Sequence, residues 1–337
     1  MVKIIIFVVI MFEILIMTHE FGHFYTARKT GVVVEEFAVG MGPALIKKEK
    51  NGTVYSLRIF PIGGFVSMEG ETETTITPGS FGARSTGQKL LIISGGAIMN
   101  FLTGVIIVFV MYSMIGTPTN IVDSVTENEP AWAAGIQSGD AIVSVNGVET
   151  SGWKDLKKEI NSLKGGTTAV IGIERDGEKT PVYYDVNVDE TDEGVAFIGI
   201  IPESRFNLIQ TVKNTAIGTV NLVYVMYKSI EMLITGEASV KEVVGPVGVV
   251  SVFNSVADQG IYYIMYLTAL ISVNLAVVNM LPFPALDGGH FVFIVLDAVL
   301  KNGVNQKFRN AANYTGLVLL MVLMVVITLK DIKQFIL

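Results

Sequence analysis

The chain has 337 residues, of which 50% are hydrophobic and 16% are charged, and its formal net charge is −7. Soluble proteins carry about 25% charged residues, so this deficit, with uncharged runs of about twenty residues, excludes an ordinary soluble enzyme and a disordered chain. The negative net charge argues against nucleic acid as a partner, and the absence of cysteine excludes disulfides and thiolate metal sites.

Four apolar segments are each long enough to cross a bilayer core of about 30 Å. They lie in residues 1–27, 90–115, 261–310 and 311–337. Lysine and arginine are concentrated in residues 28–89 and in the loop holding Lys301, Lys307 and Arg309, which the positive-inside rule places in the cytoplasm. Residues 116–203 are then extracytoplasmic.

Residues 28–89 are predicted to form a membrane-associated β region on the cytoplasmic side. Two β-prone stretches, 32–39 and 53–60, flank Asn51-Gly52, which is a typical two-residue hairpin turn. A third short strand is expected at residues 64–68.

Residues 116–203 differ in composition, with sixteen Asp or Glu against six Lys or Arg. Short β-prone runs alternate with turns such as Asn146-Gly147, and residues 153–163 are predicted to be helical. This pattern predicts one inserted β-rich module with a small core of its own.

Residues 204–260 are predicted to hold an amphipathic helix and a connector. The helix is nearly apolar enough to cross the membrane, but polar residues recur along it at helical spacing. They are Gln210, Asn214, Asn221, Lys228 and Glu231. A span here would also place Asp287 on the membrane face opposite His19, whereas the side chains of these two residues are suited to one shared site. We therefore expect this helix to lie at the outer interface.

The first apolar segment contains His19-Glu20-Phe21-Gly22-His23, an H-E-x-x-H motif. Histidines four residues apart share one helix face and can bind one Zn²⁺, with Glu20 beside them as a candidate base. The motif also arises by chance, but ionisable side chains deep in a spanning helix are costly and indicate function. Two of the three histidines in the chain fall here.

A hydrolytic zinc site needs a third protein ligand, and Asp287 is the candidate. Pro282 and Pro284 break the preceding helix, so that non-helical backbone can turn the carboxylate into the protein. The alternative is a loop carboxylate on the cytoplasmic surface. His290 is either a further ligand or, as we favour, a hydrogen-bonding neighbour or helix-start residue.

Three more polar residues lie in or near apolar helices. Asn279 and Asn100 either hydrogen-bond between helices or donate to a tetrahedral oxyanion. Glu13 lies seven residues before Glu20 and is expected on the same helix face. Its role, structural or in proton transfer, is open.

The H-E-x-x-H motif and Asn279-x-x-Pro282-x-Pro284-x-Leu286-Asp287-Gly288 together resemble the site-2 protease family, in particular its bacterial regulator-of-sigma-E branch. The resemblance covers nearly the whole chain, including residues 61–66 and 245–248. One departure is Gly95-Gly96, where the family usually has Gly-Pro; we expect only a local change in helix geometry.

The resemblance implies a polytopic α-helical membrane protein with four transmembrane helices. It implies His19, His23 and Asp287 as the ligands of one Zn²⁺ per chain, Glu20 as general base and Asn279 as a helper near the substrate. It also implies strands folded back toward the membrane beside the site.

An edge strand in that region is a candidate to hold unwound substrate by β-addition. Its residues are Gly64, Phe65 and Val66.

Residues 130–142 and Val145-Asn146-Gly147 resemble a circularly permuted PDZ domain. The resemblance makes Phe197, Ile198, Gly199 and Ile200 the candidate peptide-binding loop. The alternative is a spacer without a binding role.

These features predict a zinc-dependent intramembrane endopeptidase of the bacterial plasma membrane, with its zinc site toward the cytoplasm. The expected partners are the lipid bilayer and single-span membrane proteins trimmed beforehand by another protease, such as anti-sigma factors or remnant signal peptides. Two other classes remain open. A catalytically silent membrane-anchored PDZ scaffold has no use for Glu20, and a metal transporter fits poorly with four spans and one metal site.

Overall fold

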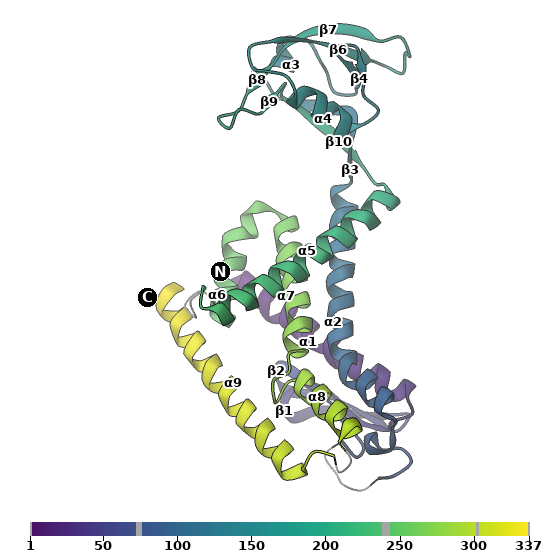
Figure 1. Cartoon of the computed structure of the whole chain (residues 1–337), viewed down its shortest axis with the longest axis vertical. Helices are drawn as coiled ribbons and strands as arrows, with labels where there is room; N and C mark the ends of the chain where they lie inside the picture. Colours follow the sequence, from purple (N-terminus) through teal and green to yellow (C-terminus); the bar gives the residue numbers. More distant parts are fainter. Residues whose placement is uncertain (1, 72–75, 238–242, 301–302, 336–337) are drawn as a thin grey trace. The chain divides into compact units, whose positions relative to one another are not determined.

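A computed structural model describes residues 2–71, 76–237, 243–300 and 303–335, and the chain divides into two compact units (Figure 1). One unit comprises Met1–Met111 and Thr215–Leu337, and the other comprises Tyr112–Asn214. The second unit is therefore inserted into the first, because the chain leaves the first unit once and returns to it.

The first unit is mainly helical. Its helices are α1 (Val2–Lys29), α2 (Thr86–Ile115), α5 (Leu208–Thr235), α6 (Pro246–Val256), α7 (Ile261–Asn279), α8 (Asp287–Val299) and α9 (Gln306–Phe335), with the short helices η1 (Phe81–Ala83) and η3 (Ala257–Gln259). The helices α2 and α5 run across the boundary between the two units.

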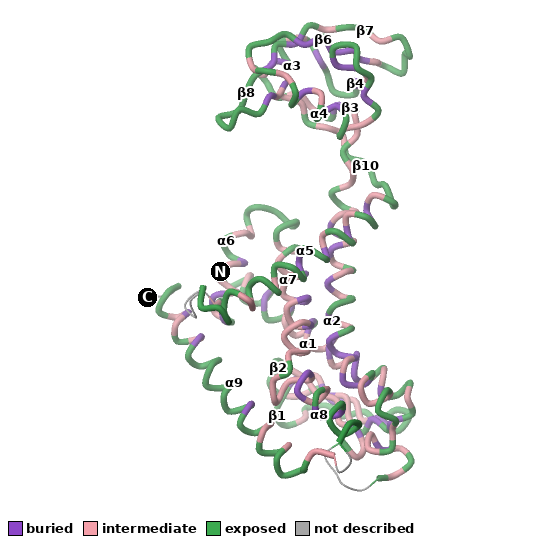
Figure 2. The backbone as a smooth tube through the Cα atoms, in the orientation of Figure 1, coloured by how far each residue is buried: buried purple, intermediate pink, exposed green. Residues whose placement is uncertain are grey.

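In the described part of the chain, five helices are long and apolar enough to cross a membrane: α1, α2, α5, α7 and α9. Many of their large apolar side chains are exposed, as α9 illustrates over most of its length (Figure 2). Apolar surface on this scale is stable against lipid rather than water. The chain is thus a polytopic helical membrane protein with an inserted β domain.

The predicted count of four spans is not confirmed, because α5 also has the length and apolarity of a span. The predicted polar stripe of α5 is present: Gln210 Nε2 donates to Asn214 Oδ1 at 3.0 Å, and Lys228 Nζ pairs with Glu231 Oε2 at 2.6 Å. An interfacial position for α5 stays a prediction.

The first unit also holds an antiparallel pair of strands, β1 (Val34–Lys50) and β2 (Thr53–Met68). The hairpin turn predicted at Asn51-Gly52 is confirmed, since both residues have the positive φ, 54° and 76°, that a type I′ turn requires. Its predicted position against the membrane stays a prediction.

The strand predicted at residues 64–68 is present, but it is continuous with the preceding strand, since β2 runs to Met68. Residues 36–39 of β1 pair with both residues 54–57 and residues 64–67 of β2. The β2 strand therefore curls around β1, and residues 64–67 form an outer edge that no other described strand covers.

The second unit is a β domain built on a six-stranded sheet. Its strands are β3 (Thr117–Val125), β4 (Ala141–Val145), β5 (Val148–Glu149), β6 (Thr168–Glu174), β7 (Val182–Asn187) and β10 (Ile200–Arg205), with a separate pair β8 (Asp189–Glu190) and β9 (Ala196–Phe197) and the helices α3 (Pro130–Ala133) and α4 (Trp153–Asn161). The sheet order is β10-β3-β4-β6-β7, with β5 on β4.

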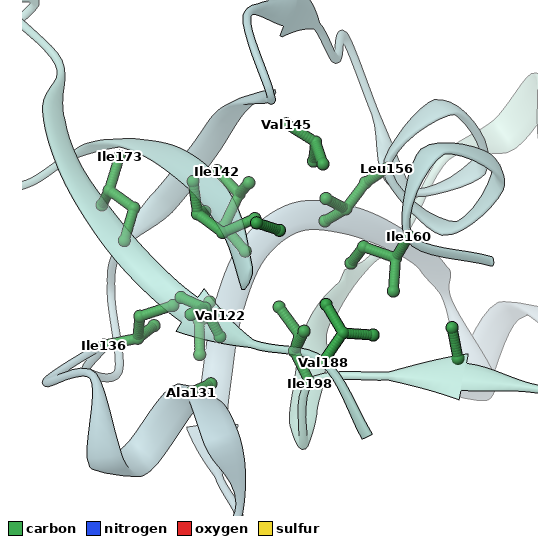
Figure 3. Packing of buried hydrophobic residues seen from close by; sticks show 14 residues of the cluster. Val122, Ala131, Ile136, Ile142, Val145, Leu156, Ile160, Ile173, Val188 and Ile198 are labelled. Carbon is green, nitrogen blue, oxygen red and sulfur yellow. The ribbon is translucent and has the colours of Figure 1, made fainter. Parts of the chain in front are cut away.

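One hydrophobic core fills the β domain. The sheet contributes Val122 and Ile142, and the predicted helix α4 contributes Leu156 and Ile160, four residues apart on one face (Figure 3). These side chains are buried and point toward one another, so the insert has its own core.

Candidate metal centre

The helices α1 and α2 touch backbone to backbone. A Cβ atom on Gly22 would lie 2.1 Å from the Gly95 carbonyl oxygen, and one on Gly95 would lie 2.6 Å from the Gly22 carbonyl oxygen. Only glycine fits at such distances, and small residues typically allow membrane helices to approach this closely. The contact lies within the H-E-x-x-H motif, so it determines what that motif faces.

Gly96 makes room for the two imidazole rings. A Cβ atom on Gly96 would lie 2.5 Å from His23 Nε2 and 2.6 Å from His19 Nε2. The Gly95-Gly96 pair, which the sequence marks only as a local departure from the family motif, thus serves two purposes. Gly95 allows the helix contact, and Gly96 allows the rings to lie between the helices.

A sharp turn carries Asp287 toward α1. Pro282 and Pro284 separate α7 from α8, and Ala285 adopts a positive φ of 75°. The turn is tight, because a Cβ atom on Gly288 would lie 2.1 Å from the Leu281 carbonyl oxygen. The non-helical backbone therefore directs a carboxylate at the start of α8 into the protein.

Three side chains converge on one point. Asp287 Oδ2 lies 3.0 Å from His19 Nε2 and 3.3 Å from His23 Nε2, and the two Nε2 atoms are 3.2 Å apart. A tetrahedral zinc ion with bonds of about 2.0 Å separates its ligand atoms by about 3.3 Å. The three atoms therefore fit one zinc ion. Among the described residues, His19, His23 and Asp287 are the group whose ligand atoms lie close enough together to hold a metal ion.

The histidine rings are buried and partly fixed by hydrogen bonding. His23 Nδ1 lies 2.9 Å from the Ile92 carbonyl oxygen, which can only accept, so Nδ1 carries the hydrogen. That tautomer leaves the Nε2 lone pair free for a metal ion. Sequence reasoning missed Ile92, because any residue type offers the same backbone carbonyl.

Glu20 faces a cavity of about 270 Å³ that His19, Asp287, Asn100 and Asn279 also line. Asn100 is 1% exposed, and neither side-chain amide atom has a hydrogen-bond partner among the described residues. Leaving a buried amide unpaired costs about 1–3 kcal/mol. The geometry thus speaks against a helix–helix hydrogen bond of the Asn100 side chain and leaves its amide available to a ligand.

A second cavity of about 180 Å³ lies between Glu20 and the edge of β2, where Phe65 and Val66 line it. His290 also lines this cavity, with its Nε2 atom 3.4 Å from Asn313 Nδ2. His290 is therefore outside the three-residue cluster and lies in the first turn of α8. This position agrees with a hydrogen-bonding or helix-start residue rather than a further metal ligand. Glu71, which the sequence did not single out, lines the same cavity.

The candidate peptide-binding loop lies in the β domain. Phe197 ends β9 and Ile200 begins β10, and between them Ile198 is buried and Gly199 has a φ of 79°. Together with α4, this loop lines a cavity of about 290 Å³. Peptide binding there stays a prediction.

Comparison with known proteins adds a family match. A model of peptidase family M50 matches residues 7–323. A protein of Clostridium acetobutylicum named as a zinc metalloprotease is 33% identical over 330 residues, which are 97% of each chain. The zinc metalloprotease RasP of Shouchella clausii is 28% identical over 407 residues, covering 96% of this chain and 97% of RasP.

Among solved structures, the PDZ domain of an SdrC-like protein from Listeria monocytogenes matches 25% of this chain and 86% of its own. The identity is 24% and the TM-score is 0.23.

Replacing Gly96 with alanine should weaken zinc binding about ten- to hundredfold, the range typical of disturbed neighbours of metal ligands. The added methyl group would lie 2.5 Å from His23 Nε2, so an imidazole ring must move. Zinc content and competition with a chelator measure the effect. Gly87→Ala is the matched control in the same helix, since a Cβ atom there meets nothing within 4 Å. Parental zinc affinity in a folded Gly96→Ala variant would contradict this account.

Proposed function

We propose, on the premise that this chain belongs to peptidase family M50 and is a zinc metalloprotease, that it cleaves the transmembrane segments of single-span membrane proteins. The observation that carries the proposal is the convergence of His19, His23 and Asp287 within 3.3 Å of one another beside Glu20. His19, Glu20 and His23 lie on α1, a helix apolar enough to span a membrane, where peptide bonds of such substrates are found.

His19, His23 and Asp287 would hold the zinc ion through Nε2, Nε2 and Oδ2. When bound, zinc supplies Lewis-acid polarisation of the scissile carbonyl and makes water more acidic. The fit rests on the separations of the three ligand atoms and on the buried rings.

Glu20 acts as the general base in this proposal. It takes a proton from the attacking water and passes it to the leaving amide nitrogen. Its place on both cavities supports the role, since Glu20 borders the space beside His19 and Asp287 as well as the space beside the β2 edge. The amides of Asn279 and Asn100 line the larger cavity and are the candidate donors to the negative charge that develops on the carbonyl oxygen.

The substrate has to be unwound before cleavage, because a helical peptide bond is shielded by its own turn. The outer edge formed by Gly64, Phe65 and Val66 of β2 would hold the unwound segment by main-chain pairing. The edge is supported as a docking strand by its position on the cavity beside Glu20.

The partners in this proposal are the lipid bilayer and membrane proteins of a bacterial plasma membrane that another protease has already trimmed. Anti-sigma factors and remnant signal peptides are the substrate classes. The positive-inside rule supports an extracytoplasmic β domain and a zinc site toward the cytoplasm. Membership of a zinc metalloprotease family decides against the scaffold and transporter alternatives.

The ligand and base roles predict different losses. His19→Ala, His23→Ala and Asp287→Asn should each lose both zinc and activity. Glu20→Gln should keep zinc while kcat falls by about 10²- to 10⁴-fold, as expected for a lost general base. Metal analysis combined with cleavage of a model membrane peptide measures both quantities. Full zinc content and activity in Asp287→Asn would disprove the third-ligand role and make His290 the next candidate.

If the β2 edge docks the substrate, cleavage should slow when a backbone N–H of that edge is removed. Proline at Val66 has no N–H, so Val66→Pro should lower kcat/KM for a membrane substrate about tenfold, the loss of roughly one hydrogen bond, without removing zinc. Val66→Ala is the control, because it shortens the side chain and keeps the N–H. Equal rates for the proline and alanine variants would dismiss the strand as a docking site.

We expect the β domain to exclude substrates whose ectodomains are large. A folded module on the extracytoplasmic side would exclude bulky ectodomains, so replacing residues 120–202 with a short linker should leave zinc content unchanged. The shortened enzyme should cleave full-length substrates that the parent leaves intact. Cleavage of matched substrates with long and short ectodomains measures the effect. Loss of all cleavage would indicate recruitment by the β domain instead, and unchanged size discrimination would place the filter elsewhere.

A further inference from the structure

We infer that Glu13 is a positioning residue, which holds the β2 edge at a fixed place along α1 and thereby decides which substrate bond meets Glu20. The inference rests on the proposed function, because it assigns a role to the strand that would dock the substrate. A hydrogen bond joins α1 to Gly63 of β2, the residue just before the docking edge.

Glu13 accepts a hydrogen bond from the backbone N–H of Gly63 through Oε2 at 2.9 Å. The other oxygen, Oε1, is buried and has no hydrogen-bond partner among the described residues. A carboxyl group in a spanning helix is costly, and a half-satisfied one is more so. Because Glu13 is unfavourable in a spanning helix and bonds to the proposed docking strand β2, a role at that strand explains it better than packing does.

Glu13 and Glu20 lie beside the same strand at matching intervals. Glu20 and Val66 line one cavity, and Val66 is three residues after Gly63. Seven residues of helix at about 1.5 Å each span about 10 Å, and three residues of strand at about 3.3 Å each span about 10 Å. The positive φ of Gly63, 85°, breaks the regular alternation of the strand, so the N–H groups of Gly63 and Val66 can both face α1.

The strand is also packed tightly between these two positions. A Cβ atom on Gly64 would lie 3.0 Å from Met17 Cε on α1 and 2.7 Å from the Ala38 carbonyl oxygen on β1. On the next residue, the Arg58 guanidinium lies 4.7 Å from the centre of the Phe65 ring. The edge therefore has little freedom to slide along α1 while Glu13 holds Gly63.

The two carboxyl groups differ in what catalysis requires of them. Glu20 lies next to His19 in the proposed catalytic centre, whereas Glu13 lies six residues before His19. The Gly63–Glu13 hydrogen bond takes no part in the proton transfer. It is therefore the contact that can keep the strand in register throughout the reaction.

The test compares Glu13→Leu and Glu13→Gln with the parent enzyme. Leucine removes the acceptor, so kcat/KM for a membrane peptide should fall about tenfold, and mass spectrometry of the products should show cleavage at additional bonds. Glutamine keeps a side-chain oxygen that accepts from Gly63, so rate and cleavage position should stay within about twofold of the parent. Zinc content should not change in either variant. Ile14→Ala is the matched control, because Ile14 neighbours Glu13 on α1 and is 57% exposed.

Hydrogen exchange of the peptide containing residues 63–68 gives a readout independent of activity. Exchange should be faster in Glu13→Leu than in the parent, Glu13→Gln and Ile14→Ala. An inactive parent enzyme would contradict the proposed function, while the exchange result would still decide the Glu13 contact. Parental exchange and a single parental cleavage site in Glu13→Leu would overturn the inference, as would equal losses in the leucine and glutamine variants.

Discussion

The backbone contact between Gly22 on α1 and Gly95 on α2 is the constraint on which the metal centre depends. Gly22 lies three residues after His19 on α1, and Gly96 of α2 lies against the rings of His19 and His23, so the imidazoles are on the side of α1 that touches α2. At this separation the α2 backbone itself becomes part of the site: the Ile92 carbonyl oxygen lies 2.9 Å from His23 Nδ1, and Gly96 leaves the space for both rings. A larger residue at the contact would separate the helices and leave ionisable groups facing lipid, where they are unstable.

The third candidate ligand, Asp287, is also positioned by close packing of glycine against backbone carbonyl groups. Gly288 lies against the Leu281 carbonyl, and a Cβ atom on Gly316 of α9 would lie 2.3 Å from the Pro284 carbonyl oxygen. The turn that carries Asp287 is thus held from within and from the next helix. Close glycine contacts on both sides of the site, between Gly22 and Gly95 and around the turn before Asp287, thus position the three ligand atoms. Precise placement of this kind is what metal binding by a small number of side chains requires.

The sequence predicted the parts of the site that are close together along the chain. His19, Glu20 and His23 lie within about one helical turn, and the prolines before Asp287 indicate a helix end. It predicted the hairpin turn for the same reason. It did not predict the full length of β2, since Pro61 and Gly63-Gly64 are local signals for a strand end, and pairing of residues 64–67 with β1 overrides them. Nor did it predict the partners of His23 and Glu13, because Ile92 and Gly63 contribute backbone atoms that every residue type has.

The metal centre also bears on how α5 meets the membrane. Asp287 follows the carboxyl end of α7, and it lies 3.0 Å from His19 in the carboxyl-terminal half of α1. If α1 and α7 both span, they run in the same direction, and α2 runs back between them. The chain between α2 and α7 must then return to the side that it left, which requires an even number of crossings. The helix α6 has 11 residues and at about 1.5 Å per residue is too short to cross a core of about 30 Å. A crossing by α5 alone would separate Asp287 from His19, so their contact supports an interfacial α5 whose polar stripe faces the headgroups.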